Sequence, residues 1–533
     1  MPTPLAPLVP KDLADLMASG ASHAVLDLRE RGAYERGHVF RATSLPRRLL
    51  EWRLSALVPA RRTPLAIYDA DGALADLARP TLAAMGYTDV RLLQGGLDAW
   101  RAAGLPVVQG LNVPSKVFGE QALHRWKTPQ IAPRELEARI ARGEDLVIVD
   151  SRTPEEYHRG CIPGAWSVPG GELVLRIGDL VARPDTTIVV HCGGRTRSYI
   201  GAESLRRMGL PNPIVALENG TMGWDLAGLT LERGAARWAP AVSARSRAQA
   251  EAVTDRVAAE ETLRFVGPDD LTRILAGRRE ASAYVFDVRT ADEYAAGHVA
   301  GAVWAPGGQA VQATDEYVAD RAGTIVFVCD GRVRSIMTAA WYKRMGFRDV
   351  AVLEGGLPAW ERMGGAIERG HPVPAPFGLD AARATVERVA PDDLGTAVVL
   401  DVDTSDVYAA GHVPGATWLC RSRLELRVGA VAPDRNASVV VTSADSAAAT
   451  LAAATLAALG YRAVRVLDGG TRAWEAGGLP LDRGATRLGD VADDVVQKAS
   501  ERRRPAMESY LRWEEALDDR GRSPHPLLPG SAR

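Results

Sequence analysis

The feature that most constrains the fold of this chain is an internal repeat that occurs four times along its 533 residues. Each copy opens with an apolar run that ends in Asp, and a second apolar run ends 42 residues later. A glycine-rich turn followed by Trp closes each copy, 73 or 74 residues after the Asp. Such regular spacing predicts four units that share one fold. The four Asp residues are Asp27, Asp150, Asp287 and Asp401, and the four Trp residues are Trp100, Trp224, Trp360 and Trp474.

Short β-branched runs alternate with Ala- and Leu-rich stretches of helical spacing inside each copy, as in TLAAATLAALG. Strands that alternate with helices predict an α/β fold, in which a mostly parallel sheet carries helices on both faces. A unit of about 100 residues is long enough to bury its own core. We therefore expect four tandem domains and a C-terminal tail, with boundaries at residues 8–108, 128–235, 262–370, 386–484 and 485–533.

Two segments outside the repeats have helical character. Residues 240–262 are rich in Ala, Arg and Glu, and the tail contains the amphipathic stretch AMESYLRWEEALDDR. An apolar stripe on an otherwise charged helix has to be covered by something. We expect the tail segment to be a helix that docks on the rest of the chain.

The composition argues against several kinds of partner and site. The chain has 64 Lys and Arg against 66 Asp and Glu, so we expect neither a nucleic-acid nor an anionic-membrane partner. No apolar run approaches the ~18 residues that span a bilayer, and the stretch MPTPLAPLVPKDL lacks the basic and apolar regions of a secretory signal. Four scattered cysteines without a CxxC pair argue against zinc and thioredoxin-like sites. They favour reduced thiols in a cytoplasmic protein.

The stretch HCGGRTRS, residues 191–198, carries the strongest chemical signal. Cys192 follows the apolar run TIVV, so we expect it at the carboxyl end of a strand, where α/β units bind ligands. A helix N-terminus and the two arginines behind it should lower the pKa of this thiol, and the thiolate is the nucleophile. Gly193 and Gly194 let the backbone curl around the sulfur. These residues predict a nucleophilic thiol in an anion-binding loop.

These motifs resemble those of the rhodanese family over nearly the whole chain, roughly residues 8 to 484. Cys161 departs from the family, which has His at this position, as the other three repeats do. We interpret Cys161 as a packing substitution, with a second redox thiol as the alternative. In the second repeat the motifs are Asp150-Ser-Arg152, Glu156-Tyr157, Gly160-Cys161-Ile-Pro-Gly164-Ala165, Cys192 to Arg197, and Gly220 to Trp224.

The resemblance implies a sulfurtransferase that needs no metal and no organic cofactor. Cys192 would attack the outer sulfur of a donor, become a persulfide, and pass the sulfur to a thiol or cyanide acceptor. Thiosulfate is the leading donor, and 3-mercaptopyruvate is the alternative. Arg197 would end the loop, and Arg195 could meet the anionic group of the donor. The backbone that would cradle the donor is that of Gly193, Gly194, Arg195, Thr196, Arg197 and Ser198.

The four repeats differ at the position of this cysteine. The first has Asp69 and the fourth has Ser443, so we expect neither to catalyse sulfur transfer. The third keeps Cys329, but the adjacent Asp330 opposes formation of the thiolate. We therefore rank Cys192 first and Cys329 second as catalytic residues. The other candidate contact residues are Arg332 and Arg334 in the third repeat and Arg176 in the second.

Arg176 has two interpretations. Arg53 and Arg427 hold the same position in the first and fourth repeats, whereas the third has Ala313. Arg176 is therefore either a substrate contact that the third repeat lacks or a surface ion-pair partner.

Two other classes of function stay open. A binding module, or a persulfide carrier for a partner enzyme, would take up sulfur without turning over a small acceptor. Related phosphatases and arsenate reductases carry one more residue between Cys and Arg. Four residues intervene here in both Cys-bearing repeats, which favours sulfur. Because the family often pairs an inert unit with an active one, we expect the first repeat to pack on the second and the third on the fourth.

Overall fold

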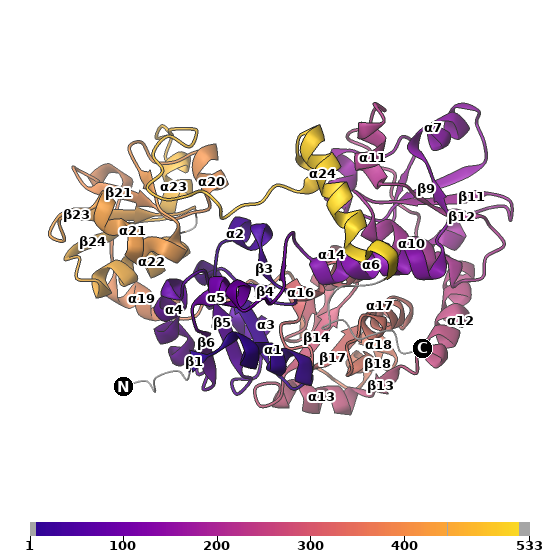
Figure 1. Ribbon diagram of the computed structural model, residues 1–533, viewed down its shortest axis with the longest axis horizontal. Helices are drawn as coiled ribbons and strands as arrows, with labels where there is room; N and C mark the ends of the chain where they lie inside the picture. The colour runs from indigo at the N-terminus through magenta and orange to yellow at the C-terminus, as the bar shows by residue number, and fades with distance from the viewer. Residues whose placement is uncertain (1–6, 445, 522–533) are drawn as a thin grey trace.

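Each repeat folds around one five-stranded parallel sheet, in a computed structural model that describes residues 7–444 and 446–521 (Figure 1). Numbered in chain order, the five strands lie in the order 1-5-4-2-3 in all four sheets. Helices cover both faces of each sheet, so the predicted α/β fold and its fourfold repetition are confirmed. The remainder of the expected tail, residues 522–533, lies outside the described residues.

The first two units have the following elements. In sheet order, the strands of the first unit are β1 (Pro7–Leu8), β6 (Val90–Leu93), β5 (Leu65–Tyr68), β2 (Ala24–Asp27) and β4 (Thr43–Ser44). Its helices are α1 (Pro10–Ser19), α2 (Arg31–Arg36), α3 (Leu50–Leu57), α4 (Ala73–Ala84) and α5 (Gly96–Ala102). The strands of the second unit are β8 (Gln130–Ile131), β12 (Ile214–Leu217), β11 (Thr187–His191), β9 (Leu146–Asp150) and β10 (Trp166–Ser167). Its helices are α7 (Pro133–Ala141), α8 (Pro154–Arg159), α9 (Leu173–Arg176), α10 (Thr196–Arg206) and α11 (Gly220–Leu226).

The last two units repeat this pattern. The strands of the third unit are β13 (Arg264–Val266), β18 (Val350–Leu353), β17 (Thr324–Val328), β14 (Ala283–Asp287) and β16 (Val303–Trp304). Its helices are α13 (Pro268–Gly277), α14 (Ala291–Ala296), α15 (Gly307–Gln312), α16 (Thr314–Tyr317), α17 (Val333–Arg344) and α18 (Gly356–Arg362). The strands of the fourth unit are β20 (Glu387–Val389), β24 (Ala463–Leu467), β23 (Ser438–Thr442), β21 (Val398–Asp401) and β22 (Thr417–Trp418). Its helices are α19 (Leu379–Thr385), α20 (Ser405–Ala410), α21 (Leu424–Val431), α22 (Ala447–Ala458) and α23 (Gly470–Ala476).

The apolar run of β11 shows why these segments become central strands. Ile188 and Val190 belong to one buried cluster of the second unit, while Val189, between them, belongs to another. Successive side chains of a strand point to opposite faces of the sheet, so a continuous apolar run can bury both faces. The strand therefore lies between two helix layers and delivers the next residue, Cys192, to the carboxyl edge of the sheet.

In the described part of the chain, three α-helices lie outside the four repeat units. The connector α12 (Ala244–Glu260) confirms the helix expected within residues 240–262, and α24 (Arg504–Glu515) is the expected docking helix of the tail. A helix that the sequence pattern did not indicate, α6 (Val113–Trp126), connects the first two units and packs along α10. The chain leaves the fourth unit and crosses the molecule, so that α24 lies beside α6 and α11 of the second unit (Figure 1).

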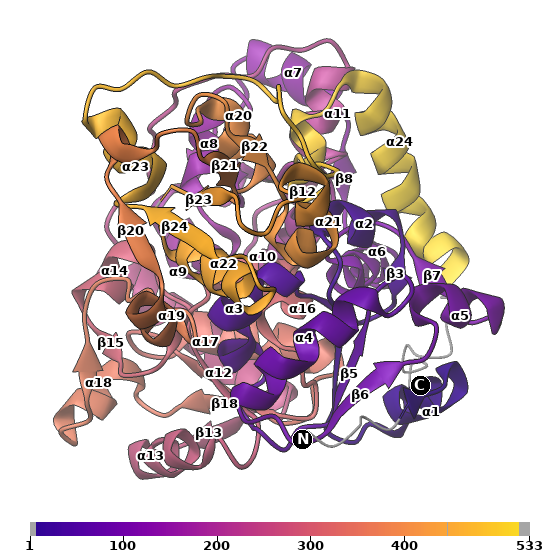
Figure 2. The ribbon, with the colours of Figure 1, turned by 90° about the vertical axis from the view of Figure 1, so that its left-hand side faces the viewer.

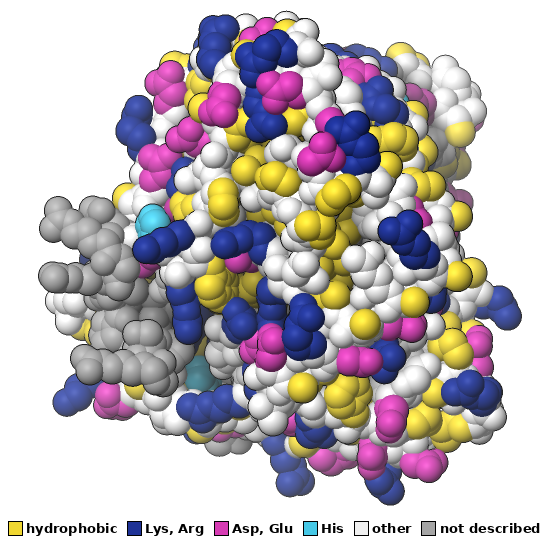
Figure 3. Space-filling model, turned by 90° about the vertical axis from the view of Figure 1, so that its right-hand side faces the viewer, with side chains coloured by type: hydrophobic (Ala, Val, Ile, Leu, Met, Phe, Trp, Pro, Cys, Tyr) yellow, Lys and Arg dark blue, Asp and Glu magenta, His cyan; other side chains and the backbone are white. Residues whose placement is uncertain are grey.

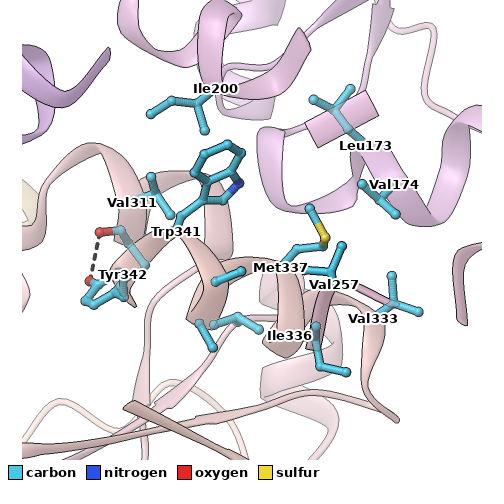
Figure 4. Close-up of a cluster of buried hydrophobic side chains, with 14 of the residues drawn as sticks. Leu173, Val174, Ile200, Val257, Val311, Val333, Ile336, Met337, Trp341 and Tyr342 are labelled. Atoms are coloured by element: carbon cyan, nitrogen blue, oxygen red, sulfur yellow. Dashed lines mark hydrogen bonds between the residues drawn. The ribbon is translucent and has the colours of Figure 1, made fainter. Parts of the chain in front are cut away.

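The second unit pairs with the third rather than with the first. One buried cluster runs through both, with Ile200 of α10 above Trp341 of α17 (Figure 4). The indole N–H of Trp341 donates to Ser204 Oγ across the interface at 3.0 Å. The pairs Gly170-Gly171 and Gly307-Gly308 meet so closely that a Cβ on Gly171 would lie 3.0 Å from the Cα of Gly307.

The first unit pairs in the same way with the fourth, and the two lie together on the face seen in Figure 2. Arg47 donates to Glu425 at 2.7 Å, and Arg421 donates to Glu51, also at 2.7 Å. These reciprocal contacts form a local pseudo-twofold pairing, as in a symmetric dimer. The expected pairs, first with second and third with fourth, are therefore wrong. The long connectors separate sequence neighbours, so surface complementarity and not chain order selects the partner.

Charge is unevenly distributed over the surface. On the face seen in Figure 3, Lys and Arg side chains gather around a hollow that has hydrophobic side chains at its base. Within the described part of the chain, no helix combines the length and the apolar character that crossing a membrane requires.

Candidate functional site

The loop between β11 and α10 holds Cys192 at the carboxyl edge of the central strand. The glycine-rich turn before α11 fixes this loop, because the carbonyl of Cys192 accepts from the Thr221 N–H at 2.9 Å. Gly220, with φ 54°, makes the approach possible, since a Cβ there would lie 2.3 Å from the Cys192 carbonyl oxygen. The Gly-rich turn that closes the second repeat thus supports the cysteine loop of the same repeat.

The backbone of this loop is arranged to receive an anion. Among the described residues, the N–H groups of Gly193, Gly194 and Arg195 find no acceptor. The Ser198 hydroxyl lies 3.4 Å from Sγ of Cys192 and donates to the Arg195 carbonyl at 2.7 Å. Unpaired N–H groups at the start of a helix are a ready anion site.

The first unit shows what such a loop can hold. There Asp69 replaces the cysteine, and its carboxylate accepts from the N–H groups of the third, fifth and sixth residues that follow it. The last of these, Ala75, donates at 3.1 Å. The loop of the first unit therefore binds a carboxylate of the chain itself, and its donor Gly72 stands at the position of Arg195, whose N–H is unpaired. This supports an anion-binding role for the equivalent loop of the second unit.

Arg197 lies over the cysteine loop. It donates to both carboxylate oxygens of Glu156, at 2.8 and 3.0 Å, and to Gln309 Oε1 of the third unit at 3.2 Å. Burial alone would lower the pKa of this guanidinium, but Glu156 and the Cys192 thiol raise it above its ordinary value. Burial would likewise raise the pKa of Glu156, yet Arg197 holds it well below its ordinary value. The pair is therefore ionised and fixed in place.

Arg195 serves a different purpose. Its guanidinium makes two hydrogen bonds to the fully buried Glu120 of α6, at 2.7 and 2.8 Å, and further contacts reach Asn219 and Glu515. Side chains from the connector and from the tail thus occupy its donors. Arg195 lines the cavity described below, but in this arrangement it ties α6 and α24 to the loop.

A cavity of about 350 Å³ opens at Cys192. Besides the second unit, four other parts of the chain contribute to its walls: the first unit, the connector with α6, the third unit and the tail. Lys116 of α6 contributes an ammonium group that lies 4.7 Å and 4.9 Å from the ring centroids of Tyr510 and Trp513. Cys192 itself is only 2% exposed. A small molecule that enters this cavity therefore meets a sulfur that is itself almost completely buried.

The tail holds the outer wall of the cavity in place. Met507 and Leu511 of α24 pack on Met222, next to the cysteine loop. Glu514 accepts from the Thr196 hydroxyl at 2.8 Å. Ahead of the helix, Lys498 lies 3.6 Å from Glu156. The docking helix therefore closes over residues of the candidate site.

The third unit places Cys329 in an equivalent loop with different surroundings. Its Sγ lies 3.1 Å from the Ser335 hydroxyl, and the thiol is fully buried. Burial raises the pKa of Cys329, and Asp330 raises it further against the opposing effect of Arg334. Arg332 turns to Asp255 of α12 at 2.8 Å. Cys329 does not line the cavity at Cys192.

The other candidates lie apart from the cavity. Arg176 donates to Glu172 at 2.8 Å and to the Pro240 carbonyl at 3.0 Å, and it is not part of the cavity wall. Cys161 packs in the core of the second unit, where burial raises the pKa of its thiol to about 11. In the fourth unit, Ser443 Oγ accepts from the Ala449 N–H at 3.1 Å.

The spacing of motifs within the repeats did not predict the residues that other segments bring to the site. Glu120 and Lys116 come from a connector whose residues match no repeat, and Gln309 comes from the partner unit. A signal for Gln309 was present, because it stands at the same repeat position as Glu172. That position could be assigned to the site only once the second unit was known to pair with the third.

Comparisons with known proteins agree with this arrangement. The family model of the rhodanese-like domain matches residues 9–103, 132–227, 268–363 and 387–477. The crystal structure of a thiosulfate sulfurtransferase from Pseudomonas aeruginosa is similar, with a TM-score of 0.89 and 38% sequence identity, over 96% of this chain and 97% of that chain.

Two relatives match in sequence over shorter stretches. A sulfurtransferase of Allochromatium vinosum is 30% identical over 102 residues, which cover 19% of this chain and 92% of the relative. A thiosulfate sulfurtransferase of Pseudomonas aeruginosa is 28% identical over 244 residues, which cover 37% of this chain and 88% of the relative. The chain is thus homologous to sulfurtransferases. With four copies of the domain along its length, it belongs to the rhodanese-like domain family.

Proposed function

We propose that this protein moves a sulfane sulfur from a small anionic donor to a thiophilic acceptor, with Cys192 as the nucleophile. The observation that supports this most directly is the position of Cys192 at the cavity, in a loop whose N–H groups face no acceptor among the described residues. In the first unit the Gly72 N–H, which is equivalent to the unpaired Arg195 N–H, donates to the carboxylate of Asp69. A thiolate, a persulfide and an oxyanion all suit such a loop.

The reaction would take two steps. The Cys192 thiolate attacks the outer sulfur of thiosulfate, an S–S bond forms on the cysteine, and the S–S bond of the donor breaks as sulfite leaves with the electron pair. Cyanide or a thiolate then attacks the terminal sulfur of the persulfide. The bond between the two sulfurs breaks, thiocyanate or a new persulfide leaves, and the Cys192 thiolate is restored.

The loop residues would have separate roles in these steps. Backbone N–H groups from Gly193 to Ser198 would stabilise the negative charge on the sulfur chain. Arg197 would attract the donor anion, while Glu156 holds the guanidinium in position. Four residues between Cys192 and Arg197 favour sulfur transfer over phosphatase or arsenate reductase chemistry, whose related loops are one residue longer.

Thiosulfate is our leading donor, and 3-mercaptopyruvate is the alternative. A persulfide carrier that hands its sulfur to a partner enzyme is the alternative without small-molecule turnover. The burial of Cys192 and the enclosing tail favour a small acceptor. Four free buried thiols also suit a reducing compartment such as the cytoplasm.

Cys329 is the second candidate nucleophile. Its buried thiol and the adjacent Asp330 disfavour the thiolate, so we propose that Cys192 carries most of the turnover. The test is a rate comparison of wild type, Cys192→Ser and Cys329→Ser, with thiosulfate, 3-mercaptopyruvate and an aryl phosphate as substrates. Loss of thiocyanate formation in Cys192→Ser alone supports the proposal. Hydrolysis of the aryl phosphate without sulfur transfer overturns it.

A further inference from the structure

Each loop arginine receives a contact from the other unit across the interface of the second and third units. Arg197 donates to Gln309 Oε1 at 3.2 Å, and Arg334 donates to Glu172 Oε1 at 2.9 Å. Gln309 lies 137 residues after Glu172, and the two arginines are separated by the same number. The local pseudo-twofold therefore places a neutral amide against one arginine and a carboxylate against the other.

The two arginines consequently differ in the charge that surrounds them. Among the described residues Arg197 forms one ion pair, with Glu156, which Lys498 also approaches. Arg334 has three carboxylate partners, and these are Glu172, Glu293 and Asp330. Where the third unit has Asp330, the second has Gly193.

Neighbouring cations do not remove this difference. Arg176 pairs with Glu172, and Arg247 pairs with Asp330. Counting Arg334 itself, three guanidiniums thus face three carboxylates, and their charges cancel. Around Arg197, two cations meet one carboxylate, so positive charge remains. Charge interactions are strong where water is largely excluded, so of these two ion-pair groups the one at Arg197 is the more favourable to an anion.

We propose that Gln309, supplied by the third unit, keeps the charge of Arg197 available to an anion at Cys192. Its amide oxygen holds Arg197 over the loop without cancelling the charge of the guanidinium. A carboxylate at this position would hold the arginine equally well and neutralise it, as Glu172 helps to do at Arg334. Together with Gly193 in place of Asp330, this position thus makes the charge around the second cysteine loop differ from that around the third. The identity of that donor rests on the proposed function, whereas the difference in local field does not.

The test compares Gln309→Glu, Gln309→Leu and wild type in the full chain, in a Cys329→Ser background. The first readout is the rate of Cys192 alkylation by anionic iodoacetate, divided by the rate with neutral iodoacetamide. This ratio reports the field at the sulfur and needs no sulfur transfer. We expect Gln309→Glu to lower the ratio about tenfold, since one added charge at contact distance of Arg197 cancels its attraction. Gln309→Leu adds no charge and leaves Arg197 bound to both carboxylate oxygens of Glu156, so its ratio should stay within about twofold of wild type.

The second readout is thiosulfate kinetics. Gln309→Glu should raise KM about tenfold while kcat changes less, because the lost term is attraction of the donor. Gln249→Glu on the exposed side of α12 adds the same charge elsewhere and should change neither readout. An unchanged alkylation ratio in Gln309→Glu, or an equal fall in Gln309→Leu, overturns the inference. A shifted ratio in a protein that does not transfer sulfur would refute the proposed function and leave the inference standing.

Discussion

Replacing Leu511 by Ala should loosen helix α24 from the second unit while the four sheets stay folded. The apolar face of this helix docks through Met507 and Leu511, which are 5% and 4% exposed and pack on Met222. Polar contacts from Glu514 and Glu515 to the cysteine loop complete the attachment. Leu511 therefore contributes much of the apolar contact that keeps the tail over the cavity.

The magnitude follows from the burial of this side chain. A buried Leu→Ala change costs about 2–5 kcal/mol, and a small peripheral cluster belongs near the lower end, about 2–3 kcal/mol. Since about 1.4 kcal/mol corresponds to a factor of ten, the population with α24 detached should rise about 30- to 150-fold. This loss is local, because Leu511 contacts none of the sheet cores.

Amide hydrogen exchange measures this opening segment by segment. Exchange of α24 in Leu511→Ala should accelerate by the factor above, while exchange of β11 and β23 stays unchanged. Glu508→Ala, on the exposed face of the same helix, is the matched control and should leave exchange near that of wild type. Equal acceleration in α24 and β11 would show that the tail unfolds only with the second unit, and the reasoning would be refuted.

Two further changes test the packing of the units. Asp401 is buried without the Arg partner of the other repeats, and burial together with Asp403 raises its pKa to about 7. The folded state then binds more protons than the unfolded state between about pH 4 and pH 7, so stability falls as pH rises through this range. Asp401→Asn should therefore raise the free energy of opening of β23, measured by hydrogen exchange, by about 2 kcal/mol more at about pH 8.5 than at about pH 5.5. An equal effect at both pH values would contradict this. Trp341→Ala should lower the free energy of opening of both β11 and β17, measured by hydrogen exchange, by about 3–5 kcal/mol. A loss confined to β17 would argue against a shared core.

Much of the fold could be predicted because the repeat consists of patterns among residues that are close in sequence. The period of the apolar runs fixes which segments become strands, and the short glycine-rich turns follow from the same spacing. The loop at Cys192 could be placed for the same reason, since a strand end, two glycines and a helix start are adjacent in sequence. These features depend on neighbours along the chain and need no knowledge of the tertiary arrangement.

The pairing of units could not be read from the order of the repeats. The relevant signal lies in four equivalent short segments, which read PGGE and PGGQ in the second and third units but PRRL and CRSR in the first and fourth. The glycines allow two backbones to touch, whereas the arginines need carboxylates opposite them. Surface complementarity of this kind becomes visible only when the segments are compared as possible partners.

The residues that other segments bring to the cysteine loop could not be predicted either. Glu120, Gln309 and Glu514 reach the cysteine loop from a connector, a partner unit and the tail. Their positions follow from long-range docking, which a pattern within one repeat does not encode. The assignment of Arg195 to the donor anion was based on its nearness in sequence, and the structure gives its guanidinium other partners.

The most direct test of the account is the intact mass of the protein after incubation with thiosulfate, for wild type, Cys192→Ser, Cys329→Ser and the double variant. Wild type and Cys329→Ser should each gain one sulfur atom, cyanide should remove it as thiocyanate, and Cys192→Ser should gain none. Uptake of sulfur in Cys192→Ser, or no uptake by wild type from thiosulfate or 3-mercaptopyruvate, would contradict it.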